Sequence, residues 1–242
     1  MFFEQKYRIQ VRDTGKSTKI TNKGFLGLME DVASLHSSKV GFGFYDIPKT
    51  NLTWLLLGWN LKVITRPQVE DMVYVKTWSR KIEKYYAYRE FEVHDEQGNL
   101  LAVANSKWIM IDTKNRKVKR VEDEVIKAYE SEPDYQAYKD ENMDKLKIPD
   151  DYDSSIEYKL ARRDIDIYNH MHNLYYLDLA YEALPEEIYN YENEFNNIRI
   201  SYKREIKSGK EIKCMYKKLD DKHVVVIRSK DGNTLHSIIE MW

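Results

Sequence analysis

Cysteine is almost missing from this 242-residue sequence: Cys214 stands alone, which excludes an intrachain disulfide framework and a cysteine-based metal cluster. No apolar run approaches the roughly 18 residues of a membrane-spanning helix. The first residues contain no cationic stretch followed by an apolar core, so we expect no signal peptide. We therefore expect a soluble, cytoplasmic protein with no segment inserted in a membrane.

Neither basic nor acidic residues are in excess. The chain has 39 Lys and Arg against 40 Asp and Glu, whereas a general nucleic-acid binder should carry a strong basic surplus. The histidines offer no metal-ligand spacing, because His170 and His172 are two residues apart and do not share a helix face. We expect no nucleic acid, no metal and no organic cofactor.

What the sequence does contain is enough apolar material for a core, 42% of its residues. Its length fits one large domain or two of about 120 residues. The 19 tyrosines favour a strand-rich structure, since aromatic residues suit half-buried pleated surfaces.

An internal repeat organises the chain. Tyr7 aligns with Tyr158, and the ungapped matches that follow are Arg12 with Arg163, Asp13 with Asp164, Asn22 with Asn173, and Phe25 with Tyr176. After a gap, the strand pattern of Leu61, Val63 and Val73 lies over that of Ile200, Tyr202 and Ile212. After a second gap, Gly98 falls on Gly232 and Trp108 on Trp242. The shared order of these matches predicts two copies of one domain.

Each copy has the pattern of a strand, a helix and then several antiparallel strands. In the first copy, Thr21 or Asn22 can cap a helix over about 23–39, and the turn 96–99 predicts a hairpin. The strand-like segments of this copy are 6–12, 53–63, 72–82, 87–94 and 100–112. In the second copy we expect a helix over 172–184 and strands over 197–205, 211–219, 223–229 and 234–242.

One helix wrapped by a curved antiparallel sheet is the hotdog architecture. We therefore predict an α+β protein of two tandem hotdog domains, each a long helix wrapped by such a sheet. The first domain is placed over 1–112 and the second over 156–242. A polar linker, 113–155, joins them and contains one short helix near 123–129. Two copies can form within one chain the dimer that single hotdog domains form between chains.

Three polar residues of the second copy have no counterpart in the first. They are Asp166, opposite Gly15; His170, opposite Lys19; and Glu205, on the following strand, opposite Arg66. Such a set suits thioester hydrolysis, which needs a positioned water, a base and donors for the developing oxyanion. Glu205 or His170 can activate the water, while Asp166 can orient the water or the imidazole, or attack the carbonyl directly.

Backbone groups supply the remaining part of such a site. The N–H groups at the start of the second helix, near 169–173, can be the oxyanion donors. Asp164 is a weaker catalytic candidate, because Asp13 matches it in the copy without the other groups.

Residues 164–176, DIDIYNHMHNLYY, and 201–206, SYKREI, resemble the stretches DLDVNQHVNNVKY and EYRREC of the plant and bacterial acyl-ACP thioesterases. Segments 51–66, 71–78 and 106–110 resemble parts of the first domain of the same family. The resemblance implies hydrolysis of the thioester of fatty acyl carrier protein (acyl-ACP), which releases free fatty acid and ACP in fatty acid biosynthesis.

Carried over by position, the resemblance implies that Asp166, His170 and Glu205 are catalytic. The family's asparagine between the aspartate and the histidine falls on Tyr168, so the neighbouring Asn169 is our candidate for that positioning role. A cysteine once assigned as nucleophile in plant relatives falls on Ile206, which leaves no thiol at that place. We expect Cys214 itself to be a buried bystander.

The resemblance also implies that the acyl chain lies in the first domain, between its helix and its sheet. The expected substrate-binding residues are Phe25, Leu28, Met29, Val32 and Phe44.

Because ACP is acidic, we expect a basic docking surface. The candidates are Lys203, Arg204, Lys207 and Lys210, and also Lys117, Lys119 and Arg120. An acyl-CoA thioesterase, a non-catalytic acyl-ACP binding module and a dehydratase stay open as alternatives, and so does a homodimer.

Overall fold

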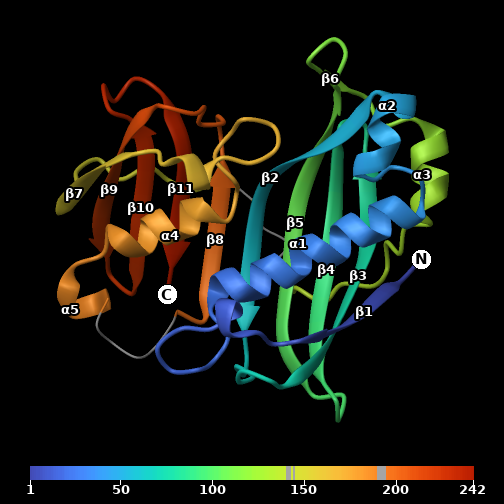
Figure 1. Cartoon of the computed structure of the whole chain (residues 1–242), viewed down its shortest axis with the longest axis horizontal. Coiled ribbons are helices and arrows are strands. Elements are labelled where there is room, and N and C mark those ends of the chain that lie inside the picture. Colours follow the sequence, from blue (N-terminus) through green and yellow to red (C-terminus); the bar gives the residue numbers. More distant parts are fainter. Residues whose placement is uncertain (140–142, 144, 190–194) are drawn as a thin grey trace. The chain divides into compact units, whose positions relative to one another are not determined.

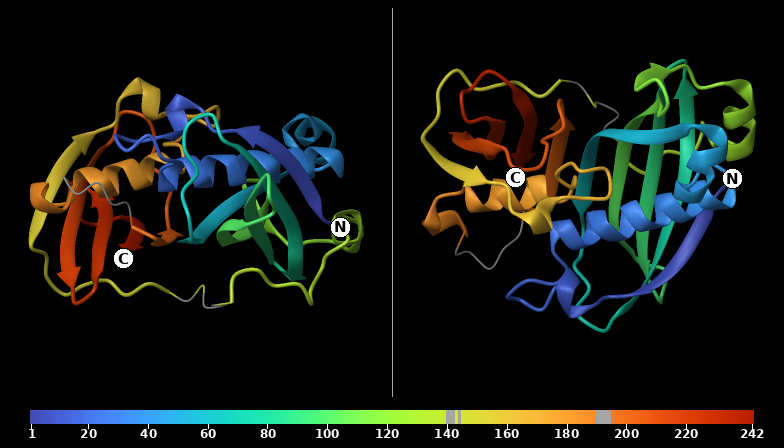
Figure 2. Two further views of the ribbon diagram at one scale, coloured as in Figure 1. Left: turned by 90° about the horizontal axis from the view of Figure 1, so that it is seen from below. Right: turned by 45° about the horizontal axis from the view of Figure 1, so that its top comes forward.

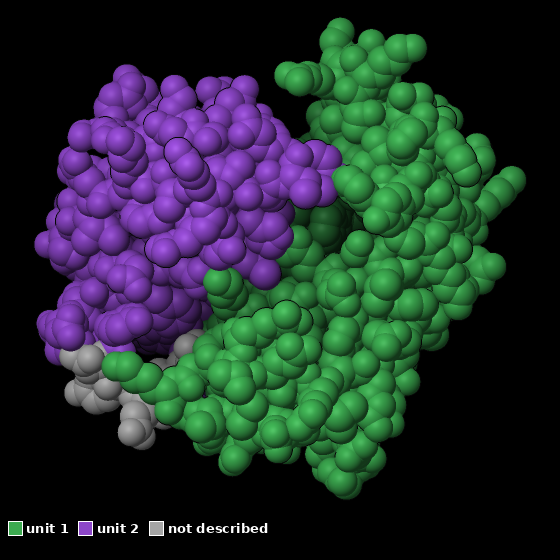
Figure 3. All heavy atoms as spheres, viewed as in Figure 1, with its two compact units in different colours: residues 1–143 green, residues 144–242 purple. Residues whose placement is uncertain are grey.

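The computed structural model describes residues 1–139, 143, 145–189 and 195–242. It divides into two compact units, Met1–Met143 (unit 1) and Asp144–Trp242 (unit 2), which Figure 3 colours separately. The predicted linker, 113–155, is divided between the two units, and its residues 140–142 and 144 lie outside the described residues. No described helix is both long and apolar enough to cross a membrane.

Unit 1 is one long helix packed on an antiparallel sheet. Its described helices are α1 (Asn22–Lys39), α2 (Ile47–Thr50) and α3 (Asp123–Tyr129), and its described strands are β1 (Phe3–Arg8), β2 (Leu52–Val63), β3 (Met72–Glu83), β4 (Tyr86–Asp95), β5 (Leu100–Asp112) and β6 (Lys117–Lys119). The strands pair in the order β1-β3-β4-β5-β2, and β6 pairs with β5. Helix α1 lies across this sheet and contacts β1, β2 and β3 (Figure 1).

Of the two residues predicted to cap α1, Thr21 and Asn22, the structure has Thr21 in this role. Thr21 Oγ1 accepts a hydrogen bond from Gly24 N at 3.0 Å, which satisfies one of the free amides of the first turn. Phe25, Met29 and Val32 recur on one face of the helix and are fully buried. This face is the one that holds α1 on the sheet.

Part of the predicted linker is built into unit 1 through α3. Its residues Val125 and Tyr129 are buried. The Tyr129 hydroxyl donates to Ser37 Oγ at 2.9 Å and accepts from Trp54 Nε1 at 2.9 Å. These bonds tie α3 to α1 and to β2.

Unit 2 repeats the arrangement of unit 1, which confirms the repeat. Its described elements are β7 (Ser154–Lys159), α4 (Tyr175–Glu182), α5 (Glu186–Tyr189), β8 (Asn197–Tyr202), β9 (Glu211–Leu219), β10 (Lys222–Ser229) and β11 (Leu235–Met241). The strands pair in the order β7-β9-β10-β11-β8, which is the order of unit 1 when β7 is matched with β1. The views in Figure 2 show α1 and α4 each lying across strands of its own unit.

Two boundaries ahead of the helices differ from the prediction. Strand β1 ends at Arg8 rather than at residue 12, because Gln10 N donates to Asp13 Oδ2 at 2.9 Å and closes a 3-10 turn over Val11–Asp13. Helix α4 begins at Tyr175 rather than at residue 172. Leu174 stands at the N-cap position of α4, and its apolar side chain makes no capping hydrogen bond.

The third difference concerns a predicted site residue. Strand β8 ends at Tyr202. Glu205 therefore lies in the loop 203–210, whereas we predicted that it lies on the strand. The ladder stops here because the amides of Lys203 and Arg204 both approach the same carbonyl, that of His236, at 2.8 and 3.4 Å. One acceptor shared by consecutive amides breaks the alternation of a strand pair.

Candidate active site

The loop ahead of α4 carries three of the four predicted catalytic residues. Asp166 N donates to His170 O at 2.8 Å, and Asn169 N donates to Asp166 O at 3.1 Å. The Asp166 carboxylate closes the loop from inside, because its Oδ1 accepts from Tyr168 N at 2.8 Å and from His170 N at 3.1 Å. Asp166 therefore fixes the backbone that presents the His170 side chain.

The same loop exists in unit 1 without the carboxylate. Gly15 N donates to Lys19 O at 3.1 Å, and Thr18 N donates to Gly15 O at 3.1 Å. Thr18 has a φ of 59°, matching the 64° of Asn169 at the equivalent position. Asn tolerates this left-handed conformation better than most residues. The position of Asn169, with its exposed side chain, is thus explained by the turn, and its role in positioning substrate or water stays a prediction.

The fourth residue comes from the loop 203–210. Glu205 Oε1 lies 3.1 Å from His170 Nε2, and the two side chains are 47% and 27% exposed. Met171 N donates to Ile206 O at 2.8 Å, and His170 and Lys207 form an isolated β-bridge. The backbones of the two loops therefore hold the imidazole against the carboxylate while both groups stay open to solvent.

In unit 1, Arg66 stands at the position equivalent to Glu205 and has a structural role. Arg66 donates to Ile20 O at 3.0 Å and to Asn22 Oδ1 at 2.9 Å. Lys19, which replaces the histidine, forms a β-bridge with Gln68, as His170 does with Lys207. Unit 1 keeps the backbone of this site but not its acid, imidazole or second acid.

Asp164 is a structural residue, in agreement with its rank as the weaker candidate. It is 5% exposed, and its Oδ2 accepts from Tyr158 OH and from Ala161 N, both at 2.7 Å. Asp13 accepts from Gln10 N in the same way in unit 1. This carboxylate closes a turn in both units.

The predicted oxyanion donors are mostly engaged already. The amides of Asn169, His170, Met171 and His172 donate to acceptors of the two loops, the last to Asp164 O at 3.0 Å. Asn173 N has no hydrogen-bond acceptor in the described part of the chain. Of the five amides predicted, Asn173 is the one available to a substrate.

Two tyrosines near these loops escaped the sequence prediction. Tyr176 is buried; burial raises the pKa of its hydroxyl, and the charges of Glu205 and Asp166 raise that pKa further. Tyr202 packs edge-on against Tyr176, and its hydroxyl donates to Asn173 O at 3.0 Å. The repeat could have identified both tyrosines, because unit 1 has the apolar residues Phe25 and Val63 at the equivalent positions.

The predicted acyl-binding residues differ in their placement. Phe25, Met29 and Val32 are fully buried on α1, and Leu28 is partly buried. Phe44 lies in a separate 3-10 turn, is 47% exposed and contacts the ring of Tyr45. Their contact with an acyl chain stays a prediction.

A buried polar cluster near the C-terminal half of α1 carries no pattern by which the sequence could have predicted it. Arg89 Nη1 lies 2.9 Å from His36 Nδ1 and 3.1 Å from Thr77 Oγ1, and the guanidinium stands over the Tyr129 ring at 5.6 Å. Arg89 has no carboxylate partner within the described residues. Burial, and next the charge of Arg89, lower the pKa of His36 to about 3, so this histidine is neutral.

The fold is that of solved acyl-ACP thioesterases. An acyl-ACP thioesterase from Bacteroides thetaiotaomicron has a TM-score of 0.87 and 19% identity, covering 99% of this chain and 96% of that one. A 12:0-ACP thioesterase from Umbellularia californica has a TM-score of 0.85 and 20% identity, with the same coverage. These likenesses confirm the hotdog fold.

The chain belongs to the acyl-ACP thioesterase family. Its residues 1–129 match the acyl-ACP thioesterase N-terminal domain, and residues 148–242 match the C-terminal domain. An oleoyl-acyl carrier protein thioesterase of Arabidopsis thaliana is 28% identical over 84% of this chain, and an acyl-[acyl-carrier-protein] hydrolase of Cuphea viscosissima is 26% identical over 85%. The chain spans 59% and 52% of the lengths of these two relatives.

Proposed function

We propose that the chain hydrolyses the thioester of fatty acyl-ACP and releases free fatty acid and ACP in fatty acid biosynthesis. The observation that carries this proposal is the contact of His170 with Glu205 beside Asp166, in two loops whose counterparts in unit 1 have none of the three groups. The relatives named as acyl-ACP thioesterases and hydrolases support the choice of substrate.

Water is the nucleophile in this reaction. Its oxygen bonds to the thioester carbonyl carbon, and its proton passes to the pair of His170 and Glu205. Both side chains are partly exposed, so a water and the carbonyl can approach them from solvent. A thioester needs no strong Lewis acid, because its carbonyl is more electrophilic than that of an oxygen ester.

The tetrahedral intermediate is stabilised by a backbone donor. Asn173 N, the amide of this region that has no acceptor among the described residues, faces the developing oxyanion in the proposed scheme. When the carbon–sulfur bond breaks, the proton held by the pair returns to the leaving thiolate. Fatty acid and the free thiol of ACP are the products.

The proposal is tested by measuring release of free fatty acid from palmitoyl-ACP and palmitoyl-CoA. We expect faster turnover of the ACP substrate; a strong preference for CoA would make the chain an acyl-CoA thioesterase. Binding of acyl-ACP without release of fatty acid would make it a binding module. Formation of an enoyl product from 3-hydroxyacyl-ACP would assign it to the dehydratases.

A further inference from the structure

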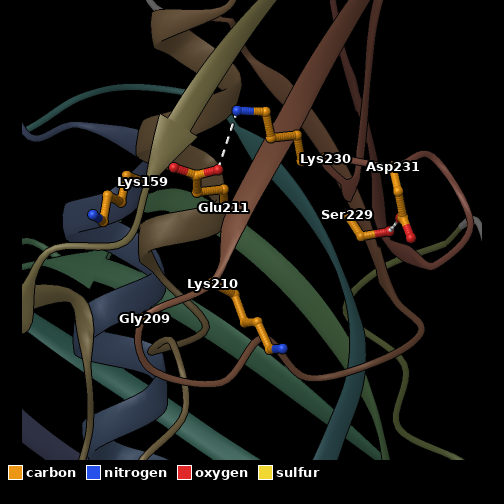
Figure 4. Close-up of a pocket in the computed structure, with 7 residues that line it drawn as sticks. All are labelled: Lys159, Gly209, Lys210, Glu211, Ser229, Lys230 and Asp231. Atoms are coloured by element: carbon orange, nitrogen blue, oxygen red, sulfur yellow. Dashed lines mark hydrogen bonds and ion pairs between the residues drawn. The ribbon is translucent and has the colours of Figure 1, made fainter.

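The loop 203–210 carries Glu205 between two anchored ends. At its start, Lys203 N donates to a carbonyl of β11 at 2.8 Å. At its end, Lys210 joins β9 and lines a surface pocket of unit 2 (Figure 4). The middle of the loop is held by Ile206, the residue that follows Glu205.

Ile206 is held through both of its backbone groups. Its carbonyl accepts from Met171 N at 2.8 Å. Its amide hydrogen bonds to the hydroxyl of Tyr176, on the first turn of α4. Ile206 and Tyr176 are 1% and 3% exposed, and a buried amide needs an acceptor. Met171 follows His170 in the chain, so the two bonds fix the residues next to both members of the His170–Glu205 pair.

Unit 1 keeps one of these bonds and lacks both partners of the other. Ile20 N donates to Pro67 O at 3.0 Å, which is the counterpart of the bond to the Ile206 carbonyl. Phe25, at the position of Tyr176, has no hydroxyl, and Pro67 has no amide hydrogen to donate. The loop is therefore compatible with a phenyl ring and a proline, and its fold alone does not call for the hydroxyl and the amide.

Tyr176 also belongs to a pair of aromatic rings that borders the site. Its ring meets that of Tyr202 edge-on, with 5.3 Å between the centroids. Tyr202 is the last residue of β8, and its hydroxyl donates to Asn173 O at 3.0 Å. The pair therefore joins the start of the loop that carries Glu205 to the residue whose amide we propose as the oxyanion donor. Unit 1 has neither hydroxyl, because both positions are apolar there.

The hydroxyl of Tyr176 keeps a proton that it can donate. Burial raises the pKa of this hydroxyl and the charges of Glu205 and Asp166 raise it further, whereas the amide of Ile206 lowers it. A tyrosine hydroxyl can accept and donate at the same time. The bond from Ile206 uses its oxygen, and its proton has no acceptor among the residues that the structure describes. The charges that act on it belong to the two carboxylates of the site, so this proton lies close to them.

We propose that Tyr176 is a further catalytic residue, whose hydroxyl donates a hydrogen bond to the water that attacks the thioester. This inference rests on the proposed function, because it assigns a residue to the reaction proposed there. The water gives its proton to the pair of His170 and Glu205 and accepts a hydrogen bond from Tyr176, so two directional bonds orient its oxygen. The tyrosine keeps its own proton throughout. Unit 1, which lacks the acid and the imidazole, lacks this donor too.

The simpler role for the hydroxyl is to satisfy the buried amide of Ile206, and a set of variants separates the two roles. Tyr176→Phe removes the hydroxyl and leaves the amide without its acceptor. Tyr176→Phe combined with Ile206→Pro removes both partners and recreates the pair that unit 1 has. Ile206→Pro alone keeps the hydroxyl. Tyr216→Phe is the matched control, because it also removes a buried hydroxyl of unit 2, one that lies 3.0 Å from His223 Nδ1.

The measured quantities are kcat and KM on acyl-ACP and on the acyl thioester of N-acetylcysteamine, together with the midpoint of urea unfolding. We expect Tyr176→Phe to lower kcat by about tenfold to a hundredfold on both substrates, with KM within about threefold of wild type. The double variant should regain the wild-type midpoint but not kcat. Ile206→Pro and Tyr216→Phe should each keep kcat within about threefold of wild type.

Recovery of kcat in the double variant would overturn the proposal, because the hydroxyl would then serve the amide alone. If proline at position 206 prevents folding, Tyr176→Phe is compared with Tyr216→Phe, since each loses one buried hydroxyl. Equal kcat values for these two variants would also overturn the proposal. Failure of the proposed function would look different: wild type would release fatty acid from neither thioester.

Discussion

The imidazole Nε2 of His170 lies 3.1 Å from Oε1 of Glu205, at the meeting of two loops whose backbones are each held independently of this contact. Asp166 closes one loop through the amides of Tyr168 and His170, and the other is held by the bond from Met171 N to Ile206 O. A side-chain pair placed by rigid backbone needs little reorganisation when charge develops.

The pair should behave as one functional unit. We expect Glu205→Gln and His170→Ala each to lower kcat by about a hundredfold, because either change breaks the path of the proton from water. The double variant should be little worse than the single ones, as expected for residues that act together. Steady-state kinetics on acyl-ACP give the four rates of this cycle, and additive losses would show that the two residues act separately.

Asp166 has two tasks that different substitutions separate. Asp166→Asn keeps an oxygen that can accept from Tyr168 N and His170 N but removes the charge, whereas Asp166→Ala loses both. We expect both variants to lose at least about a hundredfold in kcat, and only the alanine variant to lose stability, by roughly 1–3 kcal/mol.

Isotope labelling of the Asp166 carboxylate distinguishes attack by water on the thioester carbonyl from attack by Asp166 itself. Turnover in ¹⁸O-labelled water should place the label in the fatty acid alone, because water attacks the carbonyl. Label found in the carboxylate of Asp166 by mass spectrometry would instead make this residue the nucleophile.

Sequence reasoning was most accurate where local rules decide the structure. The cap by Thr21, the end of α1 at Lys39 and the whole of β5 follow from side-chain chemistry and periodicity within a few residues. The repeat also led to Asp166, His170 and Glu205, since it compares the chain with itself. The His170–Glu205 contact in the structure is consistent with that choice.

The errors lie where distant residues decide. Glu205 was placed on a strand, but the carbonyl of His236, far along the chain, ends β8 before it. The cluster of Arg89 and His36 joins β4 to α1, and no spacing in the sequence relates the two residues. Tertiary contacts of this kind override local propensity.

Arg66 should matter to folding and not to catalysis. Arg66→Ala removes the donors to Ile20 O and to the Oδ1 of the buried Asn22, so we expect a loss of roughly 1–3 kcal/mol in the free energy of unfolding. The kcat should stay within about threefold of wild type. Arg12→Ala, whose side chain is 78% exposed, is the control and should leave stability unchanged. A large fall in kcat for Arg66→Ala at wild-type stability would contradict a purely structural role.

Cys214 should be chemically silent. Burial raises the pKa of its thiol to about 12, so the reactive thiolate is scarce at neutral pH. We expect iodoacetamide at pH 8 to leave both the native thiol and the activity intact, and Cys214→Ala to keep kcat within about twofold. Rapid alkylation with loss of activity would return a thiol to the mechanism.

His36 should make stability depend on pH in a defined direction. Its pKa in the folded protein is lowered to about 3, mainly by burial and then by Arg89, whereas an unfolded histidine titrates near its usual value of about 6.5. Between these two values the unfolded state binds more protons than the folded state. The contribution of the neutral His36 to the free energy of unfolding is therefore complete above about pH 6.5 and is lost as the pH falls.

Urea unfolding of wild type and His36→Gln at pH 7.5, 6 and 5 measures this contribution. The difference between the two proteins should change by up to about 1.4 kcal/mol per pH unit. His94→Gln, at a side chain that is 25% exposed, should follow the wild-type curve. Parallel curves for wild type and His36→Gln would show that His36 is not held neutral by its surroundings.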